Sequence, residues 1–135
     1  MKKIITITIT ILLSVLFVSG CNRGNVVSGK VLFPDGTPLE HGEVMLQSTN
    51  YSAGGQINAN GTFRIYGGDT KKAIPNGEYQ VTVIAAPIGE AKADAKGQPI
   101  PLPPIIHNKF SDPTQSGLTC TVNGKTELNI TVEKP

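Results

Sequence analysis

Few side chains in this 135-residue sequence are of the types that carry out catalysis, and they are widely scattered. The two histidines, His41 and His107, lie far apart, and neither belongs to a His-Glu-x-x-His zinc motif. Ser116 precedes a glycine but lacks the Gly-x-Ser-x-Gly elbow of hydrolases. The carboxylates form neither a calcium-loop spacing nor a paired acid. We therefore expect no catalytic residue, no metal site and no cofactor, and we interpret the chain as a protein that is not an enzyme.

The two cysteines stand in different contexts. Cys120 lies on the apolar side of an alternating pattern, which predicts a buried and unreactive thiol. Cys21 follows a cationic start and an apolar run of 15 residues from Ile4 to Val18, the pattern of a secretory signal peptide over residues 1–20. An uncleaved anchor helix is the alternative, but a membrane span needs about 20 apolar residues.

The end of this segment, Val18-Ser19-Gly20-Cys21, resembles the lipobox of bacterial lipoproteins. That resemblance implies that residues 1–20 are removed and that Cys21 carries the lipid attachment. Residues 21–25 would then form a short polar tether to the membrane. The expected location is the cell envelope, lipid-anchored and periplasmic or cell-surface, and Asn22 in place of Asp favours the outer membrane.

Cleavage would change the charge of the chain. The signal contains Lys2 and Lys3 of the 12 basic residues and none of the 10 acidic ones, so the mature domain has a formal charge of zero. A neutral domain without basic clusters argues against nucleic acid as a partner and against electrostatic attachment to anionic lipid.

Beyond residue 26 the dominant hydrophobic period is two, which indicates strands buried on one face. Turn-forming clusters separate these runs, including Asn60-Gly61, for which we expect a hairpin between residues 56–59 and 62–66. Asp35 and Asp112 are expected to form turns through their side chains. About seven short strands predict an all-β fold, a Greek-key β-sandwich of the Ig-like type. The residues expected to face inward are Val27, Gly29, Val31, Phe33, Val44, Leu46, Phe63, Ile65, Tyr79, Val81, Val83, Ala85, Leu118, Cys120, Val122, Leu128, Ile130 and Val132.

One segment departs from the pattern. Residues 87–104 contain five prolines and no strand alternation. We expect a mobile, partly polyproline-II crossover at one end of the sandwich, with at most one or two helical turns within residues 89–96.

Tyr79 enters a strand after Asn76-Gly77, a position where the tyrosine of a Greek-key sandwich turns inward and bonds the upstream backbone. We therefore expect a structural role for it. The order of several motifs resembles the carboxypeptidase regulatory-like (transthyretin-like, or prealbumin-like) domains over nearly all of residues 26–133, within a domain we assign to 26–135. Those domains are non-catalytic modules. The motifs are Val27-Ser28-Gly29-Lys30-Val31, Asp35-Gly36-Thr37-Pro38-Leu39, Asn58-Ala59-Asn60-Gly61-Thr62-Phe63 and Pro75 to Val83.

Two functional hypotheses follow from these observations. The first is a non-catalytic structural or protein-binding domain at the cell envelope. The second is a glycan-binding or secretion-accessory module on the cell surface, with a binding face built from Tyr51, Tyr66 and the proline-rich segment. A glycan binder should expose two or three coplanar aromatic rings, which separates the two hypotheses.

Overall fold

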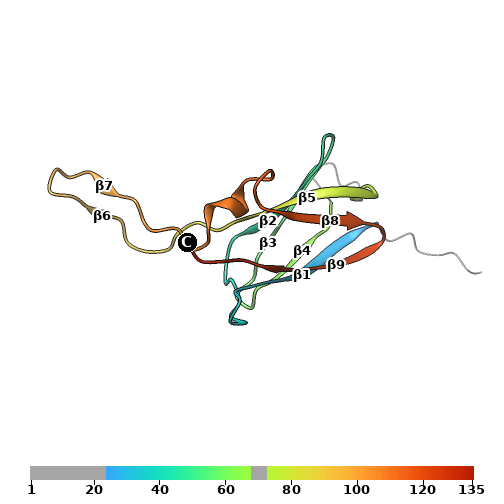
Figure 1. Cartoon of the computed structure of the whole chain (residues 1–135), viewed down its shortest axis with the longest axis horizontal. Helices are drawn as coiled ribbons and strands as arrows, with labels where there is room; N and C mark the ends of the chain where they lie inside the picture. Colours follow the sequence, from blue (N-terminus) through green and yellow to red (C-terminus); the bar gives the residue numbers. More distant parts are fainter. Residues whose placement is uncertain (1–23, 68–72) are drawn as a thin grey trace, which may run out of the picture.

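The computed structural model describes residues 24–67 and 73–135, so the expected signal peptide and Cys21 lie outside the described residues. Two facing sheets form a sandwich (Figure 1). One sheet has the strand order β4-β1-β9, the other β3-β2-β5-β8. The predicted all-β sandwich of about seven strands is confirmed. The sandwich strands are β1 (Val26–Leu32), β2 (Glu43–Gln47), β3 (Ser52–Gln56), β4 (Thr62–Ile65), β5 (Gly77–Ile84), β8 (Leu118–Val122) and β9 (Lys125–Thr131).

Between β5 and β8 the chain adds a two-stranded ribbon, β6 (Lys92–Ala93) with β7 (Pro99–Ile100), and a 3-10 helix, η1 (Asn108–Ser111). His107 caps η1, and the helix buries Phe110 against the core. Over the described ranges, no helix has the length and apolar character needed to cross a membrane.

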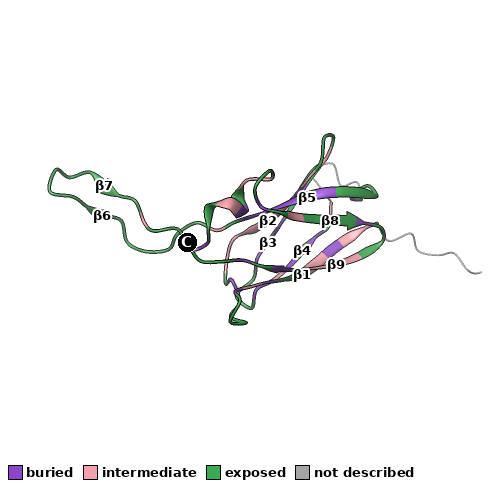
Figure 2. Cartoon of the chain, viewed as in Figure 1, coloured by how far each residue is buried: buried purple, intermediate pink, exposed green. Residues whose placement is uncertain are grey.

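The core lies between the two sheets, where buried residues alternate with more exposed ones along the strands (Figure 2). This alternation follows because successive side chains of a strand point to opposite faces of its sheet. The inward residues predicted for β1, β2, β4, β5, β8 and β9 lie on this side, Gly29, Ala85, Leu118 and Leu128 being only partly buried. In β3, for which none was predicted, Ala53 and Gly55 are buried. Each fully buried Val, Leu or Ile side chain contributes roughly 1.5–3 kcal/mol. The largest completely buried side chains are Leu39, Leu46, Ile65, Ile74, Ile130, Val27, Val31, Val44, Val81, Val83, Val122 and Val132.

The Asn60-Gly61 turn differs from the expected hairpin. Gly61 has φ +81°, and its N–H donates to Asn58 O at 2.8 Å, so a tight turn is present. Ile57 and Phe63 still form one bridge across it. The chain on either side then separates, because β3 pairs with β2 in one sheet whereas β4 pairs with β1 in the other. The predicted hairpin is therefore present only at its tip, and beyond the tip the chain turns a corner between the two sheets.

The segment 87–104 also differs from its expectation. It forms a hairpin arm that projects from the sandwich (Figure 1), in place of a polyproline crossover or helical turns. The arm closes at its tip through Asp94, whose Oδ1 accepts the N–H groups of Lys96 and Gln98 at 2.8 and 2.9 Å. Pro99 fits in β7 because it lies opposite Ala93, at a position that needs no N–H for the ribbon. We call residues 87–104 the arm.

The two ends of the sandwich carry different parts of the chain. Asn25 contacts Ile74 O and Asn76, which precede the start of β5. The arm follows the other end of the same strand, after Ile84. The start of β1 and the arm therefore lie at opposite ends of the molecule (Figure 1).

Candidate binding surfaces

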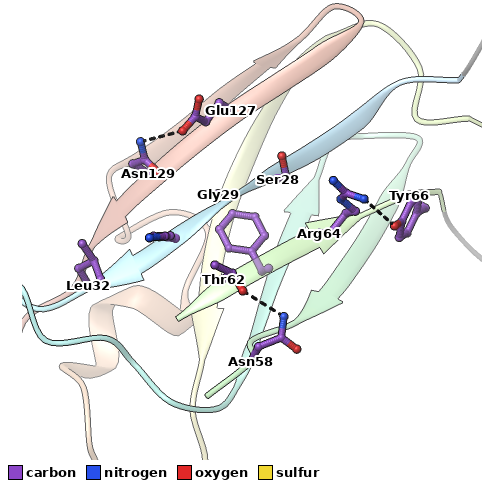
Figure 3. Close-up of a pocket in the computed structure, with 11 residues that line it drawn as sticks. Ser28, Gly29, Leu32, Asn58, Thr62, Arg64, Tyr66, Glu127 and Asn129 are labelled. Atoms are coloured by element: carbon purple, nitrogen blue, oxygen red, sulfur yellow. Dashed lines mark hydrogen bonds between the residues drawn. The ribbon is translucent and has the colours of Figure 1, made fainter. Parts of the chain in front are cut away.

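The outer face of the β4-β1-β9 sheet carries an open hollow of about 890 Å³ lined mostly by polar side chains, with the apolar Leu32 and Phe63 among them (Figure 3). Strand register explains its composition, since Ser28 of β1 lies between Arg64 of β4 and Glu127 of β9. In the next row, Lys30 lies between Thr62 and Asn129. The side chain of Ser28 is short and those of its two neighbours are long, so the centre of the face is lower than its sides.

Arg64 and Tyr66 form one side of this hollow. The Arg64 guanidinium donates to the Tyr66 hydroxyl at 3.2 Å and lies 5.7 Å from the centre of the tyrosine ring. Such a contact fixes a long side chain at an exposed site. On the opposite side, Asn129 Nδ2 donates to Glu127 Oε1 at 3.5 Å. The hollow thus offers the cationic donors Arg64 and Lys30 beside the carboxylate of Glu127. This arrangement suits hydrogen bonding to a surface that carries both donors and acceptors.

The residues considered for catalysis are not brought together. His41 Nε2 lies 2.8 Å from Ala86 O, beside the base of the arm, and His107 Nδ1 accepts the Lys109 N–H at 3.1 Å. Ser116 is buried, and its hydroxyl donates to Val81 O at 2.6 Å. Within residues 24–67 and 73–135 no three His, Cys, Asp or Glu side chains gather as a metal site would require.

Cys120 faces the core from β8, as the sequence predicts, and is 4% exposed. Burial raises the pKa of its thiol, which disfavours the reactive thiolate. Nothing in its surroundings therefore activates this cysteine as a nucleophile.

Tyr79 occupies the position of a structural corner. Its ring is 3% exposed, and its hydroxyl donates to Pro75 O at 2.7 Å, the upstream backbone contact expected from the sequence. Burial, and then the neighbouring Tyr51, raise the pKa of the phenol. How much this contact stabilises the fold stays a prediction. The role of Cys21 in lipid attachment also stays a prediction, because that residue lies outside the described part of the chain.

The surface expected from Tyr51, Tyr66 and the proline-rich segment is not assembled. Tyr51 packs edge-on against Tyr79, with 6.1 Å between ring centres, at the end of β2 distant from the arm. Tyr66 lies on the outer side of the opposite sheet, where it is 60% exposed. The three parts of the expected binding face therefore lie at three separate places on the molecule.

Sequence reasoning named the proline-rich segment and Tyr66 as parts of a binding face, but it missed the hollow and the hairpin form of the arm. The outward residues of β1, β4 and β9 could be listed from alternation, but their side-by-side order depends on pairing between distant segments. The turn at the tip of the arm had a local signal, since Asp94 and Gly97 are the first and last of the four residues that make it. The prolines around this turn led to the prediction of a polyproline segment.

Comparison with known proteins gives only distant structural likenesses. No family model matches the sequence, and no curated protein does. The major pilin subunit BcpA of Bacillus cereus is similar at 15% identity and a TM-score of 0.49, over 84% of this chain and 31% of the pilin. A DUF3823 family protein from Bacteroides ovatus is similar at 17% identity and a TM-score of 0.46, over 81% and 44%. A 9R-lipoxygenase from Cyanothece PCC8801 follows at 19% identity and a TM-score of 0.40, over 88% and 18%.

The chain spans less than half the length of each of these three proteins.

Proposed function

We propose that this chain is a lipid-anchored, extracytoplasmic β-sandwich with a non-catalytic structural or protein-binding role at the cell envelope. The supporting observation is that the two ends of the molecule carry different parts of the chain. The first described residues lie at one end of the sandwich and the arm projects from the other (Figure 1). A lipid on Cys21 would hold the first end at a membrane and present the arm away from it.

The chemistry of the surface supports binding over catalysis. The polar hollow on the β4-β1-β9 sheet is open and has paired donors and acceptors, and its lining holds no histidine or cysteine. The arm is exposed from Pro87 to Pro101 and offers its backbone and both charged and apolar side chains to a partner. These are features of a surface that docks another macromolecule.

Protein recognition is better supported than glycan recognition. Within the described ranges, Tyr66 is the only exposed aromatic side chain, because the others pack in or against the core. A glycan platform of two or three coplanar rings is therefore not formed by these residues.

The anchor is tested by labelling cells with a clickable fatty-acid analogue. The wild-type protein should be labelled, and Cys21→Ser should remain an unlabelled, unprocessed precursor. Cys120→Ser is the matched control and should be labelled like wild type, because its thiol is buried in the sandwich. Equal labelling of the wild type and Cys21→Ser would contradict the anchor.

The location is tested separately with a cysteine at the tip of the arm. In Lys96→Cys, a membrane-impermeant maleimide should label the tip in intact cells, or after permeabilisation of the outer membrane alone. Labelling that requires lysis of the cytoplasmic membrane would contradict the envelope location. Wild type sets the background from the native cysteines.

A further inference from the structure

We propose that two copies of this chain associate by antiparallel pairing of their arms along the outer edge of β6. This inference rests on the proposed protein-binding role and names the partner as a second copy. Three features of the arm support this pairing: its hydrogen-bonding pattern, the position of its prolines and the order of its charges.

The ribbon register determines which backbone groups face outward. Asp94 N–H donates to Gln98 O at 2.8 Å, so these two residues form a hydrogen-bonded pair. Pairs alternate in an antiparallel ribbon, so Ala93 and Pro99 form a non-hydrogen-bonded pair and Lys92 and Ile100 a hydrogen-bonded one. The N–H groups of Ala93 and, two residues earlier, Ala91 therefore point away from β7.

The corresponding outer edge of β7 is closed. Its outward positions are Pro99 and Pro101, and neither has an N–H group to donate. Proline at the outward positions of an edge strand is a known way to prevent strand addition. The edge of β6 has no such protection, and its outward residues carry only the methyl side chains of Ala91 and Ala93.

The side chains along β6 favour a second copy as the added strand. Lys92 of β6 and two residues just outside the strand, Glu90 and Asp94, stand at alternate positions with alternating charge, and all three are exposed. In an antiparallel pair with Ala93 opposite Ala93 of the second copy, each Lys92 lies opposite an Asp94. Opposite charges directly across a strand pair are stabilising. If the pairing were centred on Lys92 in place of Ala93, each Lys92 would lie opposite Lys92 of the second copy, and like charges would face each other.

The position of the arm permits this pairing. The arm extends beyond the sandwich, so a second arm can lie alongside it without meeting either sheet (Figure 1). The two sandwiches would lie at opposite ends of the paired arms, and their N-terminal ends would point away from each other. The paired strands are short, so we expect an association that is weak in solution and best detected by trapping.

Cysteine cross-linking of the full chain, purified in detergent and oxidised with copper phenanthroline, tests the register. Ala93→Cys should form a disulfide-linked dimer, because directly opposite residues in a hydrogen-bonded pair lie about 5.5 Å apart between Cα atoms. Ala91→Cys and Ala95→Cys are matched controls. In this register each lies about 14 Å along the strand from its own copy, which is beyond disulfide reach.

A charge variant tests the cause of the pairing. In the Ala93→Cys background, Lys92→Asp should reduce the dimer yield about fivefold, because two aspartates would then face each other, whereas Lys92→Arg should retain it. The backbone pairing of Lys92 with Ile100 within the arm does not depend on the side chain, so both variants should keep the ribbon.

Equal dimer yield at residues 91, 93 and 95 would indicate random collision and overturn the proposal. Maximal yield at Ala91 would overturn the Lys92–Asp94 register, and no dimer above the wild-type background would overturn pairing between copies. Fatty-acid labelling of the same samples reports on the anchor independently. A failed anchor and a failed arm pairing are therefore distinguishable.

Discussion

The side chain of Asn25 accepts a hydrogen bond from the backbone N–H of Gly124 at 2.9 Å, although 99 positions separate the two residues. The amide nitrogen of Asn25 donates to Ile74 O at 2.7 Å and to Asn76 Oδ1 at 2.6 Å. One side chain at the entry to β1 thus joins the segment before β5 and the turn between β8 and β9. Asn25, the last residue of the expected tether, is bonded into the sandwich.

Replacing Asn25 should destabilise this end of the sandwich. We expect Asn25→Ala to lower the free energy of unfolding by about 1–2 kcal/mol, because three backbone or side-chain groups lose a partner. Asn25→Asp keeps the acceptor for Gly124 but turns a carboxylate oxygen toward Ile74 O and Asn76 Oδ1, so it should be at least as destabilising as the alanine variant. Urea denaturation followed by circular dichroism measures the stability of both variants. An unchanged unfolding midpoint for Asn25→Ala would contradict a stabilising role of the Asn25 side chain.

Tyr79→Phe should lower the free energy of unfolding by about 1–2 kcal/mol, because Pro75 O would lose its hydrogen-bond donor while the ring stays in place. Tyr66→Phe is the matched control and should leave stability within about 0.5 kcal/mol, since that side chain is largely exposed. Thermal melts of wild type and of both variants measure these differences. Equal melting midpoints for wild type and Tyr79→Phe would mean that the Tyr79 hydroxyl contributes nothing to stability.

The arm should be dispensable for folding of the sandwich. Replacing residues 89–102 with a shorter Gly/Ser link should change stability by less than about 1 kcal/mol, because loop-closure entropy varies slowly with length. By contrast, Phe110→Ala in η1 removes a buried ring and should cost about 3–5 kcal/mol.

Limited proteolysis gives a second measure of the same independence. Cleavage should concentrate between Gly89 and Gln98, where every residue is exposed, and the two fragments should stay associated through β5 and β8. Loss of the sandwich after the first cut would show that the arm stabilises the fold.

Stability should fall in acid partly through Asp112. Its Oδ1 accepts hydrogen bonds from the N–H and hydroxyl of Thr114 at 2.8 and 2.7 Å, and these bonds hold the pKa of Asp112 below its ordinary value of 3.8. A lowered pKa in the folded state means that the carboxylate stabilises the fold above the ordinary pKa. This contribution is lost as pH falls through the folded value.

The melting temperature of wild type should therefore fall more steeply below about pH 4 than that of Asp112→Asn, which keeps the acceptor oxygen without a titrating proton. Asp35→Asn should behave likewise, because Asp35 makes the same bonds to Thr37 and has a pKa lowered by them. Parallel melting curves for all three proteins between pH 6 and pH 2.5 would contradict the prediction.

Local chemistry in the sequence was sufficient for six of the seven sandwich strands and their faces, whereas β3 lay outside the predicted runs because Gly54 and Gly55 leave it without alternating side chains. Alternation of side chains assigns Val27 and Val31 to the core without knowledge of any partner strand, because the direction of a strand side chain follows from its own backbone. The turns at Asp35 and Asp112 were predictable for the same reason, since their hydrogen bonds reach only two residues along the chain.

Only the tertiary structure decided which strands are neighbours. Asn60-Gly61 encodes a tight turn, but whether it closes a hairpin or a corner depends on pairing of β3 and β4 with other strands. The hollow between Arg64 and Glu127 exists because both lie beside Ser28, from segments far apart in the chain. At Gly29 a Cβ would clash with the backbone of Leu128, and no local pattern shows that approach. Side-chain direction is a local property of the backbone, whereas these contacts depend on hydrogen bonds between distant segments.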